Sequence, residues 1–288
     1  MMNFLKALLI LMLLQCVMVT KAYADDKVIA FVSILPQQFF VQEIGKDLVD
    51  VRVMVGPGQN PATYEPTPQQ MAALSKADVY FRIGVPFESA WLDKIKLNNK
   101  NLKIVECCKS ISNLNDHGHS HDHGHDYDPH VWTSPKKVIK IAELIKNSLI
   151  EIDNKNSAAY EASERSFNEN ITELDEVIKN KTKNIKNRML IVSHSSWSYF
   201  ADEYGFTQVS IEQGGKEIQA SSMVSLIKTA KEKNVKTIFV QPQFNDRAAK
   251  VVANELKAEI MVLDPLAFNY IENMNMVADR ILKGLSHD

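Results

Sequence analysis

Residues 155–186 form the stretch that most limits what this chain can fold into. The stretch is rich in charged residues and Asn and contains neither Gly nor Pro. Its apolar residues at 4-3-4 spacing are Phe167, Ile171, Leu174 and Ile178. This spacing predicts one amphipathic helix of roughly 45 Å, about twice the usual length in a globular domain. A coiled coil is the alternative, but the apolar stripe spans too few heptads to favour it.

Short β-rich runs alternate with helical patterns on both sides of this stretch. The predicted strands are Val28–Ser33, Val51–Val55, Val79–Ile83 and Leu102–Val105 before it, and Met189–Val192, Thr207–Ile211, Val235–Val240 and Glu259–Leu263 after it. The helices predicted between them include Pro36–Ile44, Pro68–Lys76 with Thr67 as N-cap, a helix starting at Ser134-Pro135, and segments near 196–204, 221–233, 246–257 and 268–284. Such alternation is typical of parallel sheets covered by helices.

The predicted fold class is therefore α/β, with two lobes joined by one long rigid α-helix. Each lobe should hold a mostly parallel four-stranded sheet flanked by helices. The expected parts are an N-terminal lobe at 25–153, a linker helix at 154–186 and a C-terminal lobe at 187–288. This length is sufficient for two lobes with separate cores.

The first 24 residues have the pattern of a secretory signal peptide. Lys6 supplies the positive region, Ala7–Val19 the apolar region, and Ala22-Tyr23-Ala24 the cleavage site. We therefore expect a soluble periplasmic protein without a membrane span. Lipid anchoring through Cys16 is the less favoured alternative, because Gln15 does not match the small residue expected before a lipidated cysteine.

Composition excludes some partners and says little about redox chemistry. The formal net charge is −2, from 33 basic and 35 acidic residues, so no basic surface for nucleic acid is predicted. Beyond the signal peptide the cysteines are Cys107 and Cys108. Small buried thiols are favoured for this pair over a strained vicinal disulfide.

We expect the protein to be a monomer.

The segment His117–His130 holds six of the eight histidines of the chain. Within the predicted loop 115–127, imidazoles alternate with Gly, Ser and Asp at His117, His119, His121, His123 and His125. A tract of this composition cannot build an apolar core, and His-rich tracts typically bind metal. A solvated linker and an expression tag are the alternatives. Tags, however, are usually unbroken runs at a terminus, whereas this tract is internal and interspersed.

Further candidate ligands lie at the ends of predicted strands, where ligands bind to open parallel sheets. His194, Asp264 and Gln241 each follow a strand, as does the segment Gly56–Glu65. His130 lies just before a predicted helix. Two imidazoles and a carboxylate suit zinc, which takes nitrogen and oxygen ligands tetrahedrally.

Each of these residues also has a structural interpretation. His194 alone fits a hydrogen-bonded interior histidine, Asp264 before Pro265 fits a turn residue or helix cap, and His130 fits the solvated tract. Enzyme function is not expected, because the sequence lacks the metalloprotease, serine-hydrolase, Walker and dinucleotide motifs. A metallohydrolase stays open on ligand types alone, with Glu65 as its only candidate base.

Four regions of the chain share a pattern with one known family. They are Asn60–Pro68, Asp128–Trp132, Ser193-His194 with Tyr199-Phe200 and Tyr204-Gly205, and Phe239–Phe244 with Leu263–Leu266. They resemble the zinc/manganese receptors of ABC transporters, periplasmic metal-binding proteins with two α/β lobes and a rigid connecting helix. The His-rich loop is similar to that of zinc-type members.

The resemblance implies that His130, His194 and Asp264 bind the metal. Histidine at position 194 resembles zinc-type receptors, because manganese-type members usually carry glutamate there. The sequence departs from the family at Ala62, where the first histidine normally stands. Glu65, a histidine of the 117–125 tract, or water would then have to complete the site.

The expected function is capture of a divalent metal, zinc before manganese, and its delivery to an inner-membrane ABC permease. In this reading the zinc ion is the transported ligand. The alternatives are a receptor for manganese or another metal, or a periplasmic zinc buffer or chaperone that acts through the His tract.

Overall fold

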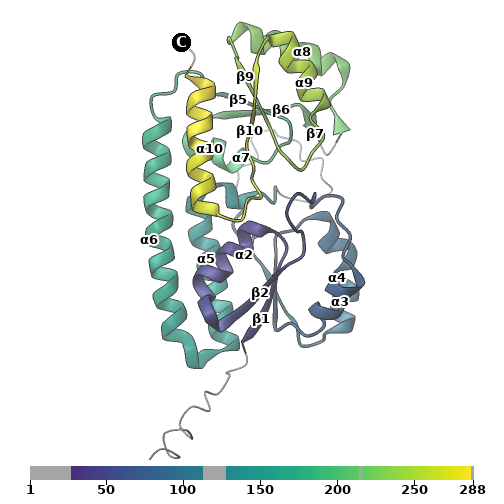
Figure 1. Ribbon diagram of the computed structural model, residues 1–288, viewed down its shortest axis with the longest axis vertical. Coiled ribbons are helices and arrows are strands. Elements are labelled where there is room, and N and C mark those ends of the chain that lie inside the picture. The colour runs from purple at the N-terminus through teal and green to yellow at the C-terminus, as the bar shows by residue number, and fades with distance from the viewer. Residues whose placement is uncertain (1–26, 113–127, 214–215, 287–288) are drawn as a thin grey trace, which may run out of the picture.

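The computed structural model describes residues 27–112, 128–213 and 216–286. The predicted signal peptide with Cys16, and the loop 115–127 with its five histidines, lie outside these residues. In the described part of the chain, no helix is both long enough and apolar enough to cross a membrane. The predicted architecture of two α/β lobes and one long helix is confirmed (Figure 1).

The N-terminal lobe is built on a parallel sheet of four strands in the order β2-β1-β3-β4. Its strands are β1 (Val28–Val32), β2 (Val49–Val53), β3 (Val79–Arg82) and β4 (Lys103–Glu106). Its helices are α2 (Leu35–Gly45), α3 (Pro68–Leu74), α4 (Pro86–Asn98) and α5 (Pro135–Ile152). Figure 1 shows α2 and α5 on the side of the long helix α6, and α3 and α4 on the opposite side.

Helix α3 shows how local sequence sets an element of this lobe. The Thr67 side chain accepts a hydrogen bond from the Gln70 backbone, and the Gln70 side chain accepts one from the Thr67 backbone. This reciprocal capping box satisfies two of the amide groups that a helix start leaves without a partner. The prediction of Thr67 as N-cap with Pro68 at the first helical position is confirmed.

The C-terminal lobe repeats the plan with a sheet in the order β10-β9-β5-β6, again parallel. Its strands are β5 (Met189–Val192), β6 (Thr207–Ser210), β9 (Thr237–Val240) and β10 (Glu259–Val262). Its helices are α7 (Ser198–Tyr204), α8 (Ala220–Glu232), α9 (Arg247–Leu256) and α10 (Tyr270–Leu285). A hairpin of β7 (Glu212–Gln213) and β8 (Lys216–Glu217) was not predicted, because two-residue strands carry no periodic signal.

The long helix α6 (Ser157–Thr182) has 26 residues and is shorter than the predicted 154–186. A short 3-10 turn at Asn154–Asn156 precedes it. The predicted stripe of four apolar residues is buried, each side chain being 2% exposed or less. Helix α6 packs on α2 and α5 of the N-terminal lobe and on α10 of the C-terminal lobe.

The chain is long enough for two separate cores, but one apolar cluster runs through both lobes. The Phe40 ring of α2 lies 5.8 Å from Phe167 of α6 and 4.9 Å from Tyr270 of α10, measured between ring centroids. A second, smaller cluster lies between the C-terminal sheet and the helices α8 and α9. Cys107 and Cys108 are buried free thiols in the larger cluster, as predicted.

Candidate metal site between the lobes

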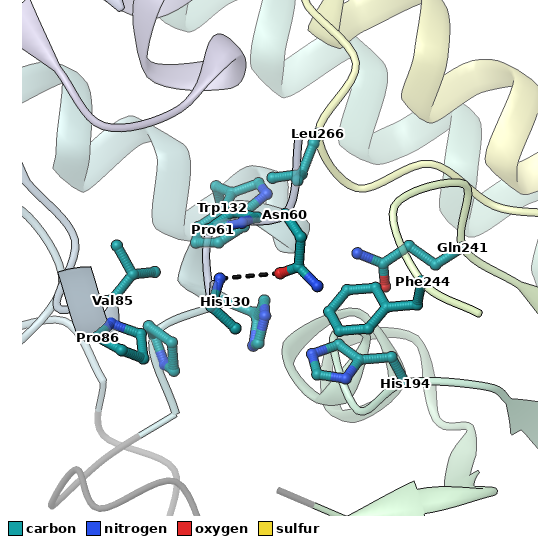
Figure 2. Close-up of a pocket in the computed structure, with 12 residues that line it drawn as sticks. Asn60, Pro61, Val85, Pro86, His130, Trp132, His194, Gln241, Phe244 and Leu266 are labelled. Carbon is teal, nitrogen blue, oxygen red and sulfur yellow. Dashed lines mark hydrogen bonds between the residues drawn. The ribbon is translucent and has the colours of Figure 1, made fainter. Parts of the chain in front are cut away.

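Two of the predicted ligands, His130 and His194, lie close together in a pocket between the lobes. Their ring centroids are 5.7 Å apart and the ring planes are inclined at 76°. Figure 2 shows the two imidazoles among the residues that line this pocket. His194 lies in the turn between β5 and α7, and His130 directly precedes the 3-10 turn Val131–Thr133.

The His130 ring is held by Asp128, two residues earlier in the chain. Asp128 Oδ1 lies 2.7 Å from His130 Nδ1 and accepts a hydrogen bond of 2.9 Å from the His130 backbone N–H. Burial opposes ionisation of Asp128, but the charge of His130 and hydrogen bonds from His130 and Ser198 lower its pKa to about 2. The carboxylate therefore stays ionised and favours a proton on Nδ1. The lone pair then lies on Nε2, the nitrogen that binds metal in such arrangements.

The His194 ring has a matching carboxylate from the β7 strand. Glu212 Oε1 lies 2.7 Å from His194 Nδ1, so the same argument assigns the metal-binding lone pair to Nε2. The Phe244 ring stacks on the imidazole, with 3.9 Å between centroids and 18° between planes. Burial lowers the pKa of His194, against the opposing effect of its hydrogen bond to Glu212, and this favours the neutral imidazole that metals require.

The remaining walls of the pocket are mostly apolar and include Ala62. The cavity measures about 60 Å³ and is lined by Asn60, Pro61, Ala62, Val85, Pro86, Pro129, His130, Trp132, His194, Gln241, Phe244 and Leu266. Besides the two imidazoles and the Trp132 indole, the side chains with polar atoms in this lining are the amides of Asn60 and Gln241 (Figure 2). Asn60 Oδ1 accepts a hydrogen bond of 2.8 Å from the Ala62 backbone N–H, and Gln241 Oε1 accepts one of 2.9 Å from Ser196 Oγ.

Asp264, the third predicted ligand, does not line this pocket. Its Oδ1 accepts hydrogen bonds from Gln243 Nε2 and from the Leu266 backbone N–H, both at 2.9 Å. The residue lines a neighbouring cavity of about 230 Å³ together with the loop 56–59. Among the described residues there is no group of three His, Cys, Asp or Glu side chains placed to hold a metal ion. The assignment of Asp264 as a ligand stays a prediction.

Glu65 is exposed and does not line the pocket either. The five tract histidines His117, His119, His121, His123 and His125 lie outside the described residues, so their predicted role stays a prediction. Gln241, which follows β9, does line the pocket, as its position at a strand end indicated.

Sequence reasoning did not identify the two carboxylates that hold the imidazoles. Asp128 belongs to the segment Asp128–Trp132, and its position two residues before His130 was a usable local signal. Glu212 had only a weak signal, its position just after β6. Its contact with His194 joins residues 18 positions apart and depends on how the β6–β7 turn folds back.

The chemistry of the pocket suits a transition-metal ion that is bound and released. Two imidazoles with carboxylates on their second nitrogens form an oriented pair of nitrogen donors. A tetrahedral ion on this pair would keep two positions for amide oxygen, water or another group. Two oriented imidazoles in a mostly apolar pocket are an arrangement that fits the binding of an ion.

Comparison with known proteins agrees with this fold. Residues 31–284 match the family described as "Zinc-uptake complex component A periplasmic". The chain is 29% identical over 262 residues to the high-affinity zinc uptake system protein ZnuA of Bacillus subtilis, covering 86% of this chain and 82% of the relative. It is 28% identical over 276 residues to the manganese-binding lipoprotein MntA of Halalkalibacterium halodurans, covering 90% and 88%.

Two solved ZnuA structures superpose on most of the chain. A crystal structure of ZnuA has 38% sequence identity and a TM-score of 0.82, covering 91% of this chain and 100% of that one. A zinc-bound ZnuA with residues 138–173 deleted has 38% identity and a TM-score of 0.84, with the same coverage. The family consists of solute-binding receptors and not of enzymes. This chain belongs to the periplasmic component A family of zinc-uptake complexes and is a metal-binding receptor of an ABC metal transporter.

Proposed function

We propose that zinc is the cargo of this receptor and that His130 and His194 bind it. The observation that carries the proposal is the imidazole pair, 5.7 Å apart between centroids, in a pocket whose described lining contains no carboxylate. Imidazole nitrogens suit zinc, whereas manganese favours carboxylate, carbonyl and water oxygens. Sequence identity does not decide between the metals, because a zinc-named and a manganese-named relative score 29% and 28%.

The substitution at Ala62 supports a site that exchanges its ion. A methyl group cannot coordinate a metal, so the loop 60–62 offers the amide of Asn60 and no imidazole to the pocket. Loss of a strong ligand weakens a closed zinc site and leaves an open position. Asp264, Glu65, a tract histidine or water are the groups proposed to complete the coordination sphere, and weaker binding is tolerable in a protein that must release its ion to a permease.

The proposed setting is the periplasm. The signal-peptide pattern of residues 1–24 and the family description support export. The alternative is lipid anchoring through Cys16, because some relatives are named as lipoproteins. A monomer is proposed as the working form, with the His tract 117–125 collecting zinc or passing it to the pocket.

The direct test replaces each pocket imidazole. His130→Ala and His194→Ala should each lower zinc affinity at least about tenfold, or about 1.4 kcal/mol, measured by competition with a chromophoric chelator. Lys228→Ala on α8 is the matched control and should bind zinc as the unaltered protein does. Unchanged affinity in both histidine variants would rule out this site.

A second candidate is a zinc buffer that works through the His tract alone. The tract composition favours it, because alternating imidazoles bind metal without a folded pocket. Deletion of residues 117–125 separates the two functions. The proposed receptor keeps one zinc ion that depends on His130 and His194, whereas a buffer loses all zinc binding.

A further inference from the structure

The segment that carries His130 is tied to the opposite lobe. Trp132 Nε1 donates a hydrogen bond of 2.7 Å to the Pro265 carbonyl, and the Trp132 carbonyl accepts one of 2.8 Å from Tyr270 OH. Pro265 and Tyr270 belong to the C-terminal lobe, 133 and 138 positions further along the chain. His130 therefore comes from the N-terminal lobe by sequence but is anchored to the C-terminal lobe by its neighbours.

Asp128 connects the His130 ring directly to the C-terminal lobe. While its Oδ1 holds His130, its Oδ2 accepts a short hydrogen bond from Ser198 Oγ, and its backbone carbonyl accepts one of 2.8 Å from Tyr199 OH. Asp128 is 6% exposed, so these bonds lie in surroundings where water competes weakly. One carboxylate thus bridges the imidazole and the first turn of α7.

The same first turn follows directly from His194. Strand β5 ends at Val192, His194 lies in the turn, and α7 begins at Ser198. The turn is fixed by the Ser193 backbone N–H, which donates a hydrogen bond of 2.8 Å to the Phe239 carbonyl. The segment from His194 to Ser198 therefore positions both imidazoles. It carries His194 itself, and it holds His130 through the hydrogen bond between Ser198 and Asp128.

We propose that Asp128 and Ser198 are positioning residues that set the distance between His130 and His194 and so prepare the pair for zinc. The inference rests on the proposed function, because it takes both imidazoles as zinc ligands. Zinc needs both nitrogens at about 2.0–2.1 Å in tetrahedral directions. A pair whose spacing is set before the ion arrives binds it without further ordering of the protein. Groups that orient a ligand in this way contribute about 10–100-fold to metal affinity.

Ser198→Ala tests the bridge while leaving the contact between Asp128 and His130 in place. Zinc affinity, measured with zinc chloride against a chromophoric chelator, should fall about 10–100-fold. Ser198→Thr keeps the hydroxyl and should restore most of the affinity. Ser225→Ala is the control and should leave binding unchanged, because Ser225 Oγ donates its hydrogen bond to the Ser221 carbonyl of its own helix α8.

A spectroscopic measurement separates positioning from general loss of structure. Cobalt bound in place of zinc should show a changed visible spectrum in Ser198→Ala and in Asp128→Asn, since the two nitrogens would no longer be set for tetrahedral coordination. Thermal unfolding of the metal-free variants should stay cooperative.

The outcomes distinguish this inference from the function on which it rests. Affinity within twofold of the unaltered protein in Ser198→Ala, with strong losses in His130→Ala and His194→Ala, overturns the positioning role and leaves the site standing. Unchanged affinity in both histidine variants overturns the site and the positioning role together. Failure of Ser198→Thr to restore binding also counts against the hydroxyl bridge.

Discussion

Different interactions join the two lobes on the side of helix α6 and on the side of the pocket. On the α6 side, apolar residues of both lobes form one continuous core, in which Phe40, Phe167 and Tyr270 are each 2% exposed or less. On the pocket side, directed hydrogen bonds cross between the lobes beside His130, from Ser198 and Tyr199 to Asp128 and between Trp132 and the segment 265–270. The α6 side joins the lobes, and the pocket side holds the proposed metal site.

This difference implies that the α6 side mainly determines stability and the pocket side mainly determines metal affinity. Burial of apolar area is non-directional and tolerates exchange of similar side chains, whereas metal binding depends on the placement of two nitrogen atoms. Changes on the α6 side should therefore alter unfolding more than zinc affinity. Changes in the pocket should do the reverse.

The largest effect is expected for Phe167→Ala on α6. The ring packs against Phe39 and Phe40 of α2 and is 1% exposed, so its removal leaves a cavity between α6 and α2. The free energy of unfolding should fall by about 3–5 kcal/mol in urea titrations. Glu173→Ala, an exposed site on the same helix, should change it little. If Phe167→Ala lowered zinc affinity as strongly as His194→Ala does, the α6 side and the pocket side would not have separate roles in stability and binding.

A smaller effect is expected for Phe244→Leu at the pocket wall. Loss of the stack on His194 removes an aromatic contact of about 0.5–1.5 kcal/mol, equivalent to about a tenfold change in affinity at most. Zinc binding should weaken two- to tenfold by this estimate while the unfolding midpoint moves little. Isothermal titration and thermal unfolding of the same samples check it. A large drop in stability with unchanged binding would assign Phe244 to the core.

The smallest effect is a pH dependence of stability in the metal-free protein. Burial lowers the pKa of His194 below its ordinary value of 6.5, so near that pH the unfolded chain binds a proton that the folded protein lacks. Stability then rises with pH and is lost as the pH falls below 6.5, by at most about 1.4 kcal/mol per pH unit for this group. Urea titrations between about pH 8 and pH 5 should show a shallower slope for His194→Gln. An equal slope in both proteins would contradict the effect.

Much of the fold was predictable because its signals are local. The 4-3-4 apolar spacing predicted the buried face of α6, and β5 was predicted at its observed bounds, Met189–Val192. The ends of α6 were less predictable, because a charged, Gly-free sequence around residues 154–156 is compatible with both an α-helix and the 3-10 turn observed there. The hairpin β7–β8 was missed because each strand has only two residues.

The site was predictable in its ligand types and only partly in its geometry. His130 and His194 meet as expected from the strand-end position of His194, while Asp264 occupies the neighbouring cavity, held by Gln243. Sequence contains no sign of that hydrogen bond, because it joins side chains 21 positions apart on two different strand ends. The same holds for Glu212 beside His194.

The alternation of strands and helices, the long connecting helix and the imidazoles available to a metal follow from local sequence, because periodicity and residue chemistry act over short distances. Tertiary structure alone decided that both lobes share one core, and that His130 is anchored across the lobe boundary by Ser198, which lies 70 positions from Asp128. These features depend on close packing and directed hydrogen bonds between remote segments, which form only once the whole chain has folded.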